Sequence, residues 1–296
     1  RSPKLRKEDE MNLKQVLQNL DTVVKTVYKT TKKEYKDPLA GILYDVTPVT
    51  GAVSNIVTLN SVPGMREFKS ERKHGVADNT VYTIAPRKWE STLDVEREKI
   101  EDDDLGQIPN QTRVMTTKSG RHYGALAVAA LPVGFTANLS DGKPFFHADR
   151  GNLIPGAFGA ATFGKAYDAL VGMKDSDGDL INPIPTHLIV GLENREEAEK
   201  ILLRERLDNG QSNPNYKRVE LIVDPRIAGK ATFLVAAKEG MCPLTIAERV
   251  KVGEPVAKTD LNSDKAFETD VFSWGLRGRY DAAYQAAQFI VGLKGV

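Results

Sequence analysis

The fold is decided by the stretch EDDDLGQIPNQTRVMTTKSGRHYGALAVAALPVG, residues 101–134. The acidic run 101–104 stabilises the N-terminus of a helix, because the helix dipole is positive at that end. Pro109 is tolerated only in the first turn of a helix. A proline and a glycine close the stretch and predict the end of the helix. The sequence therefore predicts one long helix over residues 108–131.

Upstream, residues 11–30 predict an amphipathic helix. Its apolar side chains follow helical spacing, and lysines at its C-terminal end complement the helix dipole. The helix either packs on its own domain or lies as an arm on a neighbouring subunit, and the pattern alone favours the first. The apolar positions are Met11, Leu13, Val16, Leu17, Leu20, Val23, Val24 and Val27.

Between the two helices, residues 53–59 and 80–84 predict a pair of strands. Both segments are rich in Val, Ile, Thr and Tyr, and a charged stretch with an Asp78-Asn79 turn separates them. This pattern indicates a long hairpin with a charged tip. Isolated two-stranded ribbons are marginal in water, so the hairpin is expected to need a partner surface, which another copy of the chain can supply. The alternative is a mobile surface loop.

Downstream, residues 135–255 alternate helices and strands, which predicts a mixed α/β domain. Alternating apolar residues from Phe272 to Leu276 predict a further strand near the C-terminus. The expected helices are 161–173 and 193–207, and the expected strands are 187–190, 219–223 and 232–236.

Composition excludes several classes of protein. The 296 residues carry 41 basic and 40 acidic side chains, so net charge gives no general attraction to nucleic acid or an acidic membrane. No apolar run approaches the roughly 20 residues that span a bilayer, and no secretory signal is predicted. A single cysteine, Cys242, excludes an internal disulfide and a multi-cysteine metal site.

The motifs of catalysis and metal binding do not occur. The four histidines form no HExxH pair, and neither a GxSxG elbow nor a P-loop is present. The Asp-rich turn 175–179 fails as a calcium loop, because positions six and twelve hold Leu180 and Thr186. A Ser-His-Asp triad stays open in principle, but no local signature supports one. We therefore predict no catalytic residue, no metal site and no cofactor.

Three motifs in order resemble the Mu-like major head proteins of tailed phages. They are Glu101-Asp-Asp-Asp-Leu-Gly106, Leu139-Ser-Asp-Gly-Lys-Pro-Phe-Phe146, and Pro185-Thr-His-Leu-Ile-Val190 followed by Glu193 to Asn209. No single motif is specific, whereas their order and spacing are. The resemblance runs from about Trp89 to about Ala228.

This resemblance implies an α+β chain with the Hong Kong 97-type phage capsid fold. The fold has an N-terminal arm, an extended β-hairpin loop, a peripheral domain with a long spine helix, and an axial α/β domain. The corresponding residues are 1–50 for the arm, 51–86 for the extended loop, 87–134 and 256–296 for the peripheral domain, and 135–255 for the axial domain.

The implied function is that of a major capsid protein, without catalysis. Hexamers and pentamers of the chain would form the icosahedral head shell around double-stranded DNA, which is bound without sequence specificity. The implied partners are the chain itself, portal, scaffold, maturation protease and a decoration protein, with no membrane; the locations are the virion capsid and, during assembly, the host cytoplasm. An N-terminus at Arg1 fits removal of a scaffold segment by such a protease. Two alternatives are another phage structural protein, of tail or decoration type, and a soluble α/β hydrolase.

Contacts between subunits are the predicted functional sites. Exposed ion pairs contribute only about 0–1 kcal/mol each, so apolar burial is expected to supply most of the stability of each contact, at about 25 cal/mol per Å². No covalent crosslink between subunits is predicted. The expected contacts are Arg66, Glu67, Lys69, Glu71, Arg72 and Lys73 on the extended loop, and Leu13, Leu17, Leu20 and Val24 on the arm.

Overall fold

The computed structural model describes residues 3–59, 79–102, 105–174, 178–207, 209–237 and 241–295. The chain divides into two compact units. The first comprises Arg1–Asp37, Arg87–Tyr123 and Glu248–Tyr280, and the second comprises Pro38–Pro86, Gly124–Ala247 and Asp281–Val296. Three elements, α3, β9 and β11, have residues in both units.

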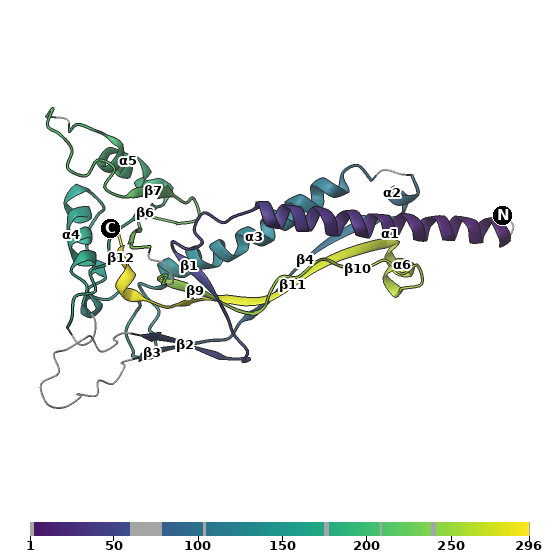
Figure 1. Ribbon diagram of the computed structural model, residues 1–296, viewed down its shortest axis with the longest axis horizontal. Helices are drawn as coiled ribbons and strands as arrows, with labels where there is room; N and C mark the ends of the chain where they lie inside the picture. Colours follow the sequence, from purple (N-terminus) through teal and green to yellow (C-terminus); the bar gives the residue numbers. More distant parts are fainter. Residues whose placement is uncertain are drawn as a thin grey trace, which may run out of the picture. The chain divides into compact units, whose positions relative to one another are not determined.

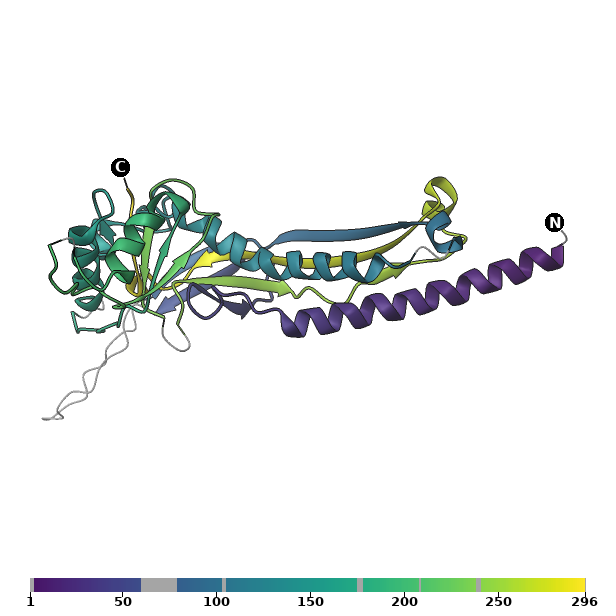
Figure 2. The same ribbon diagram turned by 90° about the horizontal axis from the view of Figure 1, so that it is seen from above.

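The first unit combines helices with a small antiparallel sheet. Strands β4 and β10 both pair with β11, and the register with β4 runs from Val271 opposite Glu96 to Tyr280 opposite Arg87. Figures 1 and 2 both show α1 running along these strands. The elements are α1 (Pro3–Glu34), β4 (Arg87–Glu96), α2 (Arg97–Glu101), α3 (Ile108–Val133), β10 (Val256–Lys258), α6 (Asp264–Thr269) and β11 (Val271–Tyr284).

An apolar stripe holds α1 on its own chain. The stripe is buried against Phe272 and Trp274 of β11, together with Val95, Ile100 and Ile108. Its positions recur at the spacing of one helix face. This explains why a lysine-rich helix that is otherwise exposed to solvent has one buried face. The four side chains at its centre are Leu13, Leu17, Leu20 and Val24.

Gly120 explains how α3 accepts a close neighbour in the first unit. A Cβ atom at Gly120 would lie 2.6 Å from the Tyr35 ring. Real Cβ atoms do not approach other heavy atoms so closely, so glycine at this helical position makes room for the ring. Glycine weakens a helix by roughly 1 kcal/mol relative to alanine, and at this position an alanine would clash with the ring.

A five-stranded sheet forms the core of the second unit, in the order β5-β12-β8-β6-β7. Strand β6 pairs parallel with β7 and antiparallel with β8, while β12 pairs antiparallel with β8 and parallel with β5. The elements are β5 (Leu153–Ile154), α4 (Ala160–Val171), β6 (His187–Val190), α5 (Arg195–Leu203), β7 (Glu220–Val223), β8 (Thr232–Val235) and β12 (Ile290–Leu293).

Different groups pack on the two faces of this sheet: helices on one face and phenylalanine rings on the other. Leu188, Leu234 and Val291 point into a cluster with the buried side chains of α4 and α5, and Figure 1 shows both helices beside the strands. Phe233 instead contacts the rings of Phe135 and Phe146, with centroids 5.8 and 5.5 Å away. Alternation along the strands thus gives a sheet buried on both sides, as its apolar sequence requires.

The remaining strands of the second unit form two further pairings. Strand β2 (Ser54–Leu59) pairs antiparallel with β3 (Asn79–Ile84), with Ile56 opposite Tyr82. Strand β1 (Tyr44–Pro48) lies beside β9 (Leu244–Val250). Short 3-10 turns occur at Ala148–Arg150, Leu192–Asn194 and Ala287–Phe289.

Most of the predicted elements are confirmed, with four corrections. The acidic run 101–104 was expected to stabilise the N-terminus of the long helix, but Glu101 ends α2, and α3 begins at Ile108 with no acid in its first turn. The predicted helix 193–207 is shorter, because α5 ends at Leu203. The Asn213 side-chain amide donates to the carbonyl oxygens of Ile201 and Arg204, both at 2.8 Å, and a longer helix would need those acceptors. Asn79 belongs to β3 and not to a turn, and Pro132 lies inside the last turn of α3.

Candidate assembly surfaces

The described histidines serve packing. His122 Nδ1 lies 2.9 Å from the Tyr280 hydroxyl oxygen, and its ring meets Trp89 edge to face at 4.4 Å. His187 contacts Thr186 Oγ1 at 2.8 Å and the exposed Glu220 carboxylate at 3.2 Å. His147 caps a short 3-10 turn, and His74 lies outside the described residues.

The cysteine and the possible metal ligands of the described residues also form no reactive site. Cys242 is buried, and burial raises the pKa of its thiol to about 12, so the thiol stays protonated and unreactive near neutral pH. Within the described ranges, no three histidine, cysteine or acidic side chains gather as a possible metal site. Part of the Asp-rich turn 175–179 lies outside those ranges. No helix among the described residues is both long and apolar enough to cross a membrane.

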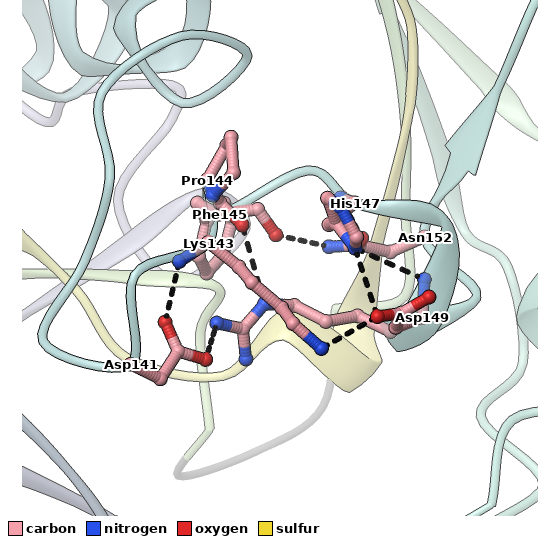
Figure 3. A network of polar contacts seen from close by, with 8 residues as sticks. Asp141, Lys143, Pro144, Phe145, His147, Asp149 and Asn152 are labelled. Carbon is pink, nitrogen blue, oxygen red and sulfur yellow. Dashed lines mark hydrogen bonds and ion pairs between the residues drawn. The ribbon is translucent and has the colours of Figure 1, made fainter.

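A polar network organises the loop between α3 and β5 (Figure 3). Arg150 pairs with the Asp141 carboxylate, and Lys143 Nζ lies 2.5 Å from the Asp149 carboxylate. The buried Asn152 donates to the Phe145 carbonyl oxygen at 3.0 Å. Its own side-chain oxygen accepts from the backbone N–H of His147, also at 3.0 Å. One asparagine thus fixes both sides of the turn.

The charges of this loop are tuned by their neighbours. Burial opposes ionisation of Asp141, but the Lys143 backbone N–H and the Arg150 guanidinium outweigh it and lower the pKa of that carboxyl. The hydrogen bond from Lys143 lowers the pKa of Asp149. Both carboxylates are therefore ionised at neutral pH. The arrangement stabilises a surface turn, and its acids and bases are paired with each other.

Two phenylalanines anchor the same loop in the second unit. Phe145 stacks on Tyr284 with ring centroids 4.4 Å apart, and Phe146 stacks on Phe135 at 4.6 Å. A Cβ atom at Gly292 would lie 2.8 Å from Phe146 and 2.9 Å from Phe135. The glycine in β12 therefore lets both rings approach the strand.

The described part of the β2–β3 ribbon is attached to the second unit by one face. Ile56 and Tyr82 are buried in a small cluster with Ala247 and Ala283, and the Tyr82 ring meets Tyr284 edge to face at 6.4 Å. Burial raises the pKa of Tyr82 and Tyr284. The base of the ribbon is therefore held by apolar contacts.

Several large apolar side chains face solvent instead of a core. Phe267 in the first unit is 91% exposed, and Ile184 in the second is 70% exposed. Single exposed apolar side chains are common on protein surfaces, whereas a contiguous patch of them indicates a surface for association. Others are Leu180, Leu192 and Leu203 in the second unit, and Val114 and Val256 in the first.

The predicted contact residues fall into two groups. The four arm residues Leu13, Leu17, Leu20 and Val24 are enclosed by their own chain. Contact with a neighbouring subunit through them stays a prediction, and it would require α1 to leave this packing. The extended-loop residues Arg66, Glu67, Lys69, Glu71, Arg72 and Lys73 lie outside the described residues.

The exposed apolar residues carry no recognisable signal in the sequence. Phe267 and Ile184 sit in short segments without a clear period, so no pattern separated them from core positions. Their exposure is set by tertiary structure, and only Pro183 and Pro185 around Ile184 hinted at an irregular surface segment.

Comparison with known families shows which family the chain belongs to. The family model described as phage capsid protein matches residues 80–291. The chain belongs to the phage capsid protein family. The match includes α3, the loop network and the five-stranded sheet of the second unit, except for the last two residues of β12.

One curated relative and two solved structures are similar to this chain. The Mu-like prophage FluMu major head subunit of Haemophilus influenzae is 22% identical over 282 residues, which cover 92% of this chain and 73% of the relative. The procapsid protein of bacteriophage JBD30 matches 92% of this chain and 73% of its own, at 20% identity and a TM-score of 0.55. The JBD30 capsid decorated with minor capsid protein trimers matches 65% of this chain and 91% of its own, at 21% identity and a TM-score of 0.55.

These matches confirm the predicted resemblance to Mu-like head proteins. The mixed helix-and-strand fold is that of phage capsid proteins, in agreement with the predicted Hong Kong 97-type fold. The phage capsid protein family is one of structural proteins of the virion, and its shells are built from many copies of a chain.

Proposed function

We propose that this chain is the major capsid protein of a tailed phage, and that its hexamers and pentamers form the icosahedral head shell around double-stranded DNA. The observation that carries the proposal is the phage capsid family match over residues 80–291. In this role the chain acts by self-assembly and not by catalysis.

We propose the following roles for the parts of the chain: residues 1–50 as the arm, 51–86 as the extended loop, 87–134 and 256–296 as the peripheral domain, and 135–255 as the axial domain. The length of α3 supports its role as the spine helix. Because the apolar stripe of α1 is already buried on its own chain, the part of the α1 surface that stays exposed, which includes Val23, is proposed to meet a neighbour.

Apolar contacts supply most of the stability of the proposed shell. Leu180, Ile184, Leu192 and Leu203 of the second unit are more exposed than buried. Covering such side chains stabilises a contact by about 25 cal/mol for each Å² of apolar surface removed from water. Repetition around a closed shell adds many such contacts. The charged residues 66–73 are proposed to pair across subunits, at about 0–1 kcal/mol for each exposed pair.

Further partners follow from the same role. The JBD30 capsid is decorated with minor capsid protein trimers, and we propose a decoration protein for this chain as well. Portal, scaffold and a maturation protease are proposed to act during assembly in the host cytoplasm. The packaged DNA is proposed to meet the shell without sequence specificity.

Electron microscopy of the recombinant chain, produced alone and with scaffold, tests the proposal directly. Closed icosahedral shells are expected. Tubes or monomers under every condition would contradict it. A deletion of residues 66–74 is expected to block shell formation while the circular dichroism spectrum and the melting temperature of the subunit stay near those of wild type, which separates assembly from folding.

A further inference from the structure

Phe267 is the most exposed large apolar side chain among the described residues, at 91%. It lies on α6, and the preceding residue, Ala266, is buried in the core of the first unit. A phenylalanine removes about 150–250 Å² from water when it is buried. A side chain of this size that its own chain leaves in water is suited to insert into a partner.

The segment that carries Phe267 is held firmly at both ends. Ser263 caps α6, with its hydroxyl oxygen accepting from the Ala266 N–H at 3.3 Å. At the other end, the Asp270 carbonyl oxygen accepts from the Arg97 N–H at 2.9 Å, and the two side chains form an ion pair at 3.6 Å. The ring is therefore presented by an ordered element, which lowers the entropy lost on binding.

A groove on the same unit offers a matching receptor. It has a volume of about 380 Å³ and lies between α3 and β4. Leu93, Val114 and Met115 provide its apolar lining, and Lys118 provides a basic rim. Val114 is more than half exposed, so this part of the groove is not covered by the chain itself.

The charge of α3, which forms one wall of the groove, is complementary to that of residues 260–270. Residues 260–270 contain four acids and one lysine, whereas α3 contains Arg113, Lys118 and Arg121 and no acid. Opposite charges around an apolar contact guide the orientation of two partners and disfavour wrong pairings. A second copy of this chain carries both surfaces, so it is a partner with the required chemistry.

We propose that Phe267 of one copy inserts into the groove at Leu93, Val114 and Met115 of a second copy. The contact joins two different patches and is therefore heterologous, so repeated copies close into a ring when the rotation allows it. This inference rests on the proposed capsid function and names one contact within the shell.

Site-directed crosslinking tests the contact in the full chain. Phe267→Cys and Val114→Cys are made in separately tagged chains, which are co-expressed and treated with a short bismaleimide reagent. The reagent suits this pair because a direct disulfide needs Cα atoms within about 7 Å. The native Cys242 is buried, and wild type treated in the same way controls for its reaction.

A crosslinked dimer that contains one chain of each kind is expected, with a yield about tenfold above either single variant alone. Absence of that product, or a product as abundant from Phe267→Cys alone, would overturn the heterologous contact. Phe267→Asp is expected to reduce shell yield about tenfold or more without changing the subunit melt, while Phe267→Leu retains shells.

Two outcomes separate this contact from the proposed function. Normal shells from Phe267→Asp, beside normal wild-type shells, would overturn the contact and leave the capsid function standing. A wild-type chain that stays monomeric under all conditions would overturn both.

Discussion

The indole Nε1 of Trp274 donates a hydrogen bond to the Asp21 carboxylate at 3.2 Å. The bond joins α1 to β11 across 253 residues of sequence. Trp274 is fully buried, and the same carboxylate binds Lys25 at 2.6 Å. The N-terminal helix is therefore docked by a specific polar contact as well as by its apolar stripe.

Removal of one side chain from the stripe of α1 is expected to destabilise the first unit. Leu20→Ala leaves a cavity beside the β11 side chains and should lower the free energy of unfolding by about 2–5 kcal/mol. Urea denaturation followed by tryptophan fluorescence measures the change. Val23→Ala, on the exposed face of the same helix, is the matched control and should change stability by less than about 0.5 kcal/mol. Equal losses from both variants would contradict the docking of α1.

In the loop network of the second unit, loss of the buried asparagine is expected to cost more stability than loss of an exposed ion pair. Asn152→Ala leaves the Phe145 carbonyl oxygen and the His147 N–H without a side-chain partner, so a loss of about 1–3 kcal/mol is expected. Lys143→Ala removes only an exposed ion pair, worth about 0–1 kcal/mol. Chemical denaturation of both variants gives the comparison. If Lys143→Ala cost more than Asn152→Ala, the loop would depend on charge and not on the buried asparagine.

Gly292 predicts a steric effect in the second unit. Gly292→Val places atoms where the rings of Phe135 and Phe146 lie, and overpacking of this kind typically costs about 1–3 kcal/mol. Gly164→Ala is the control, because a Cβ atom at this position of α4 meets nothing within 4 Å. That change is expected to stabilise the protein by about 0.4–1 kcal/mol. Thermal melts of both variants should therefore shift in opposite directions.

The exposed side chain of Ile184 offers a test of the proposed apolar contacts of the shell. Ile184→Ser is expected to leave the unfolding free energy within about 0.5 kcal/mol of wild type, while it lowers the yield of shells measured by sedimentation. Lys165→Gln, an exposed polar change on α4, should alter neither quantity. Unchanged shell yield from Ile184→Ser would remove this residue from the proposed contacts.

Local sequence signals predicted most elements because the elements that carry them are long or strongly periodic. The start of α3 followed from Pro109, and the apolar period of α1 gave its buried face. Pro132 was expected to end α3 but lies inside its last turn. The end of α5 was missed because Asn213, ten residues beyond it, binds the carbonyl groups that a longer helix would use. A contact of this kind cannot be recognised from the periodicity of the sequence.

The candidate site was less predictable than the fold. Spacing identified Leu13, Leu17, Leu20 and Val24 as one apolar face, but spacing cannot tell whether that face meets its own chain or a neighbour. Phe267 has the opposite difficulty, since an isolated aromatic residue in a short helix resembles a core residue. Only its exposure in the folded chain separates it from a core residue.

Buried tyrosines predict a loss of stability in alkali. Burial, reinforced by the charge of Glu248, raises the pKa of Tyr280 from 10.0 to about 12. Between these pH values the tyrosine of the unfolded chain loses its proton and that of the folded chain keeps it. The contribution of Tyr280 to the free energy of unfolding is therefore fully present below about pH 10 and is lost as the pH rises toward 12. For Tyr280 alone the loss is on the order of 2 kcal/mol. Urea denaturation at a series of pH values measures the decline, which Tyr280→Phe should reduce and Tyr216→Phe, at an exposed tyrosine, should leave unchanged. A decline of equal size in wild type and Tyr280→Phe would show that this hydroxyl is not responsible.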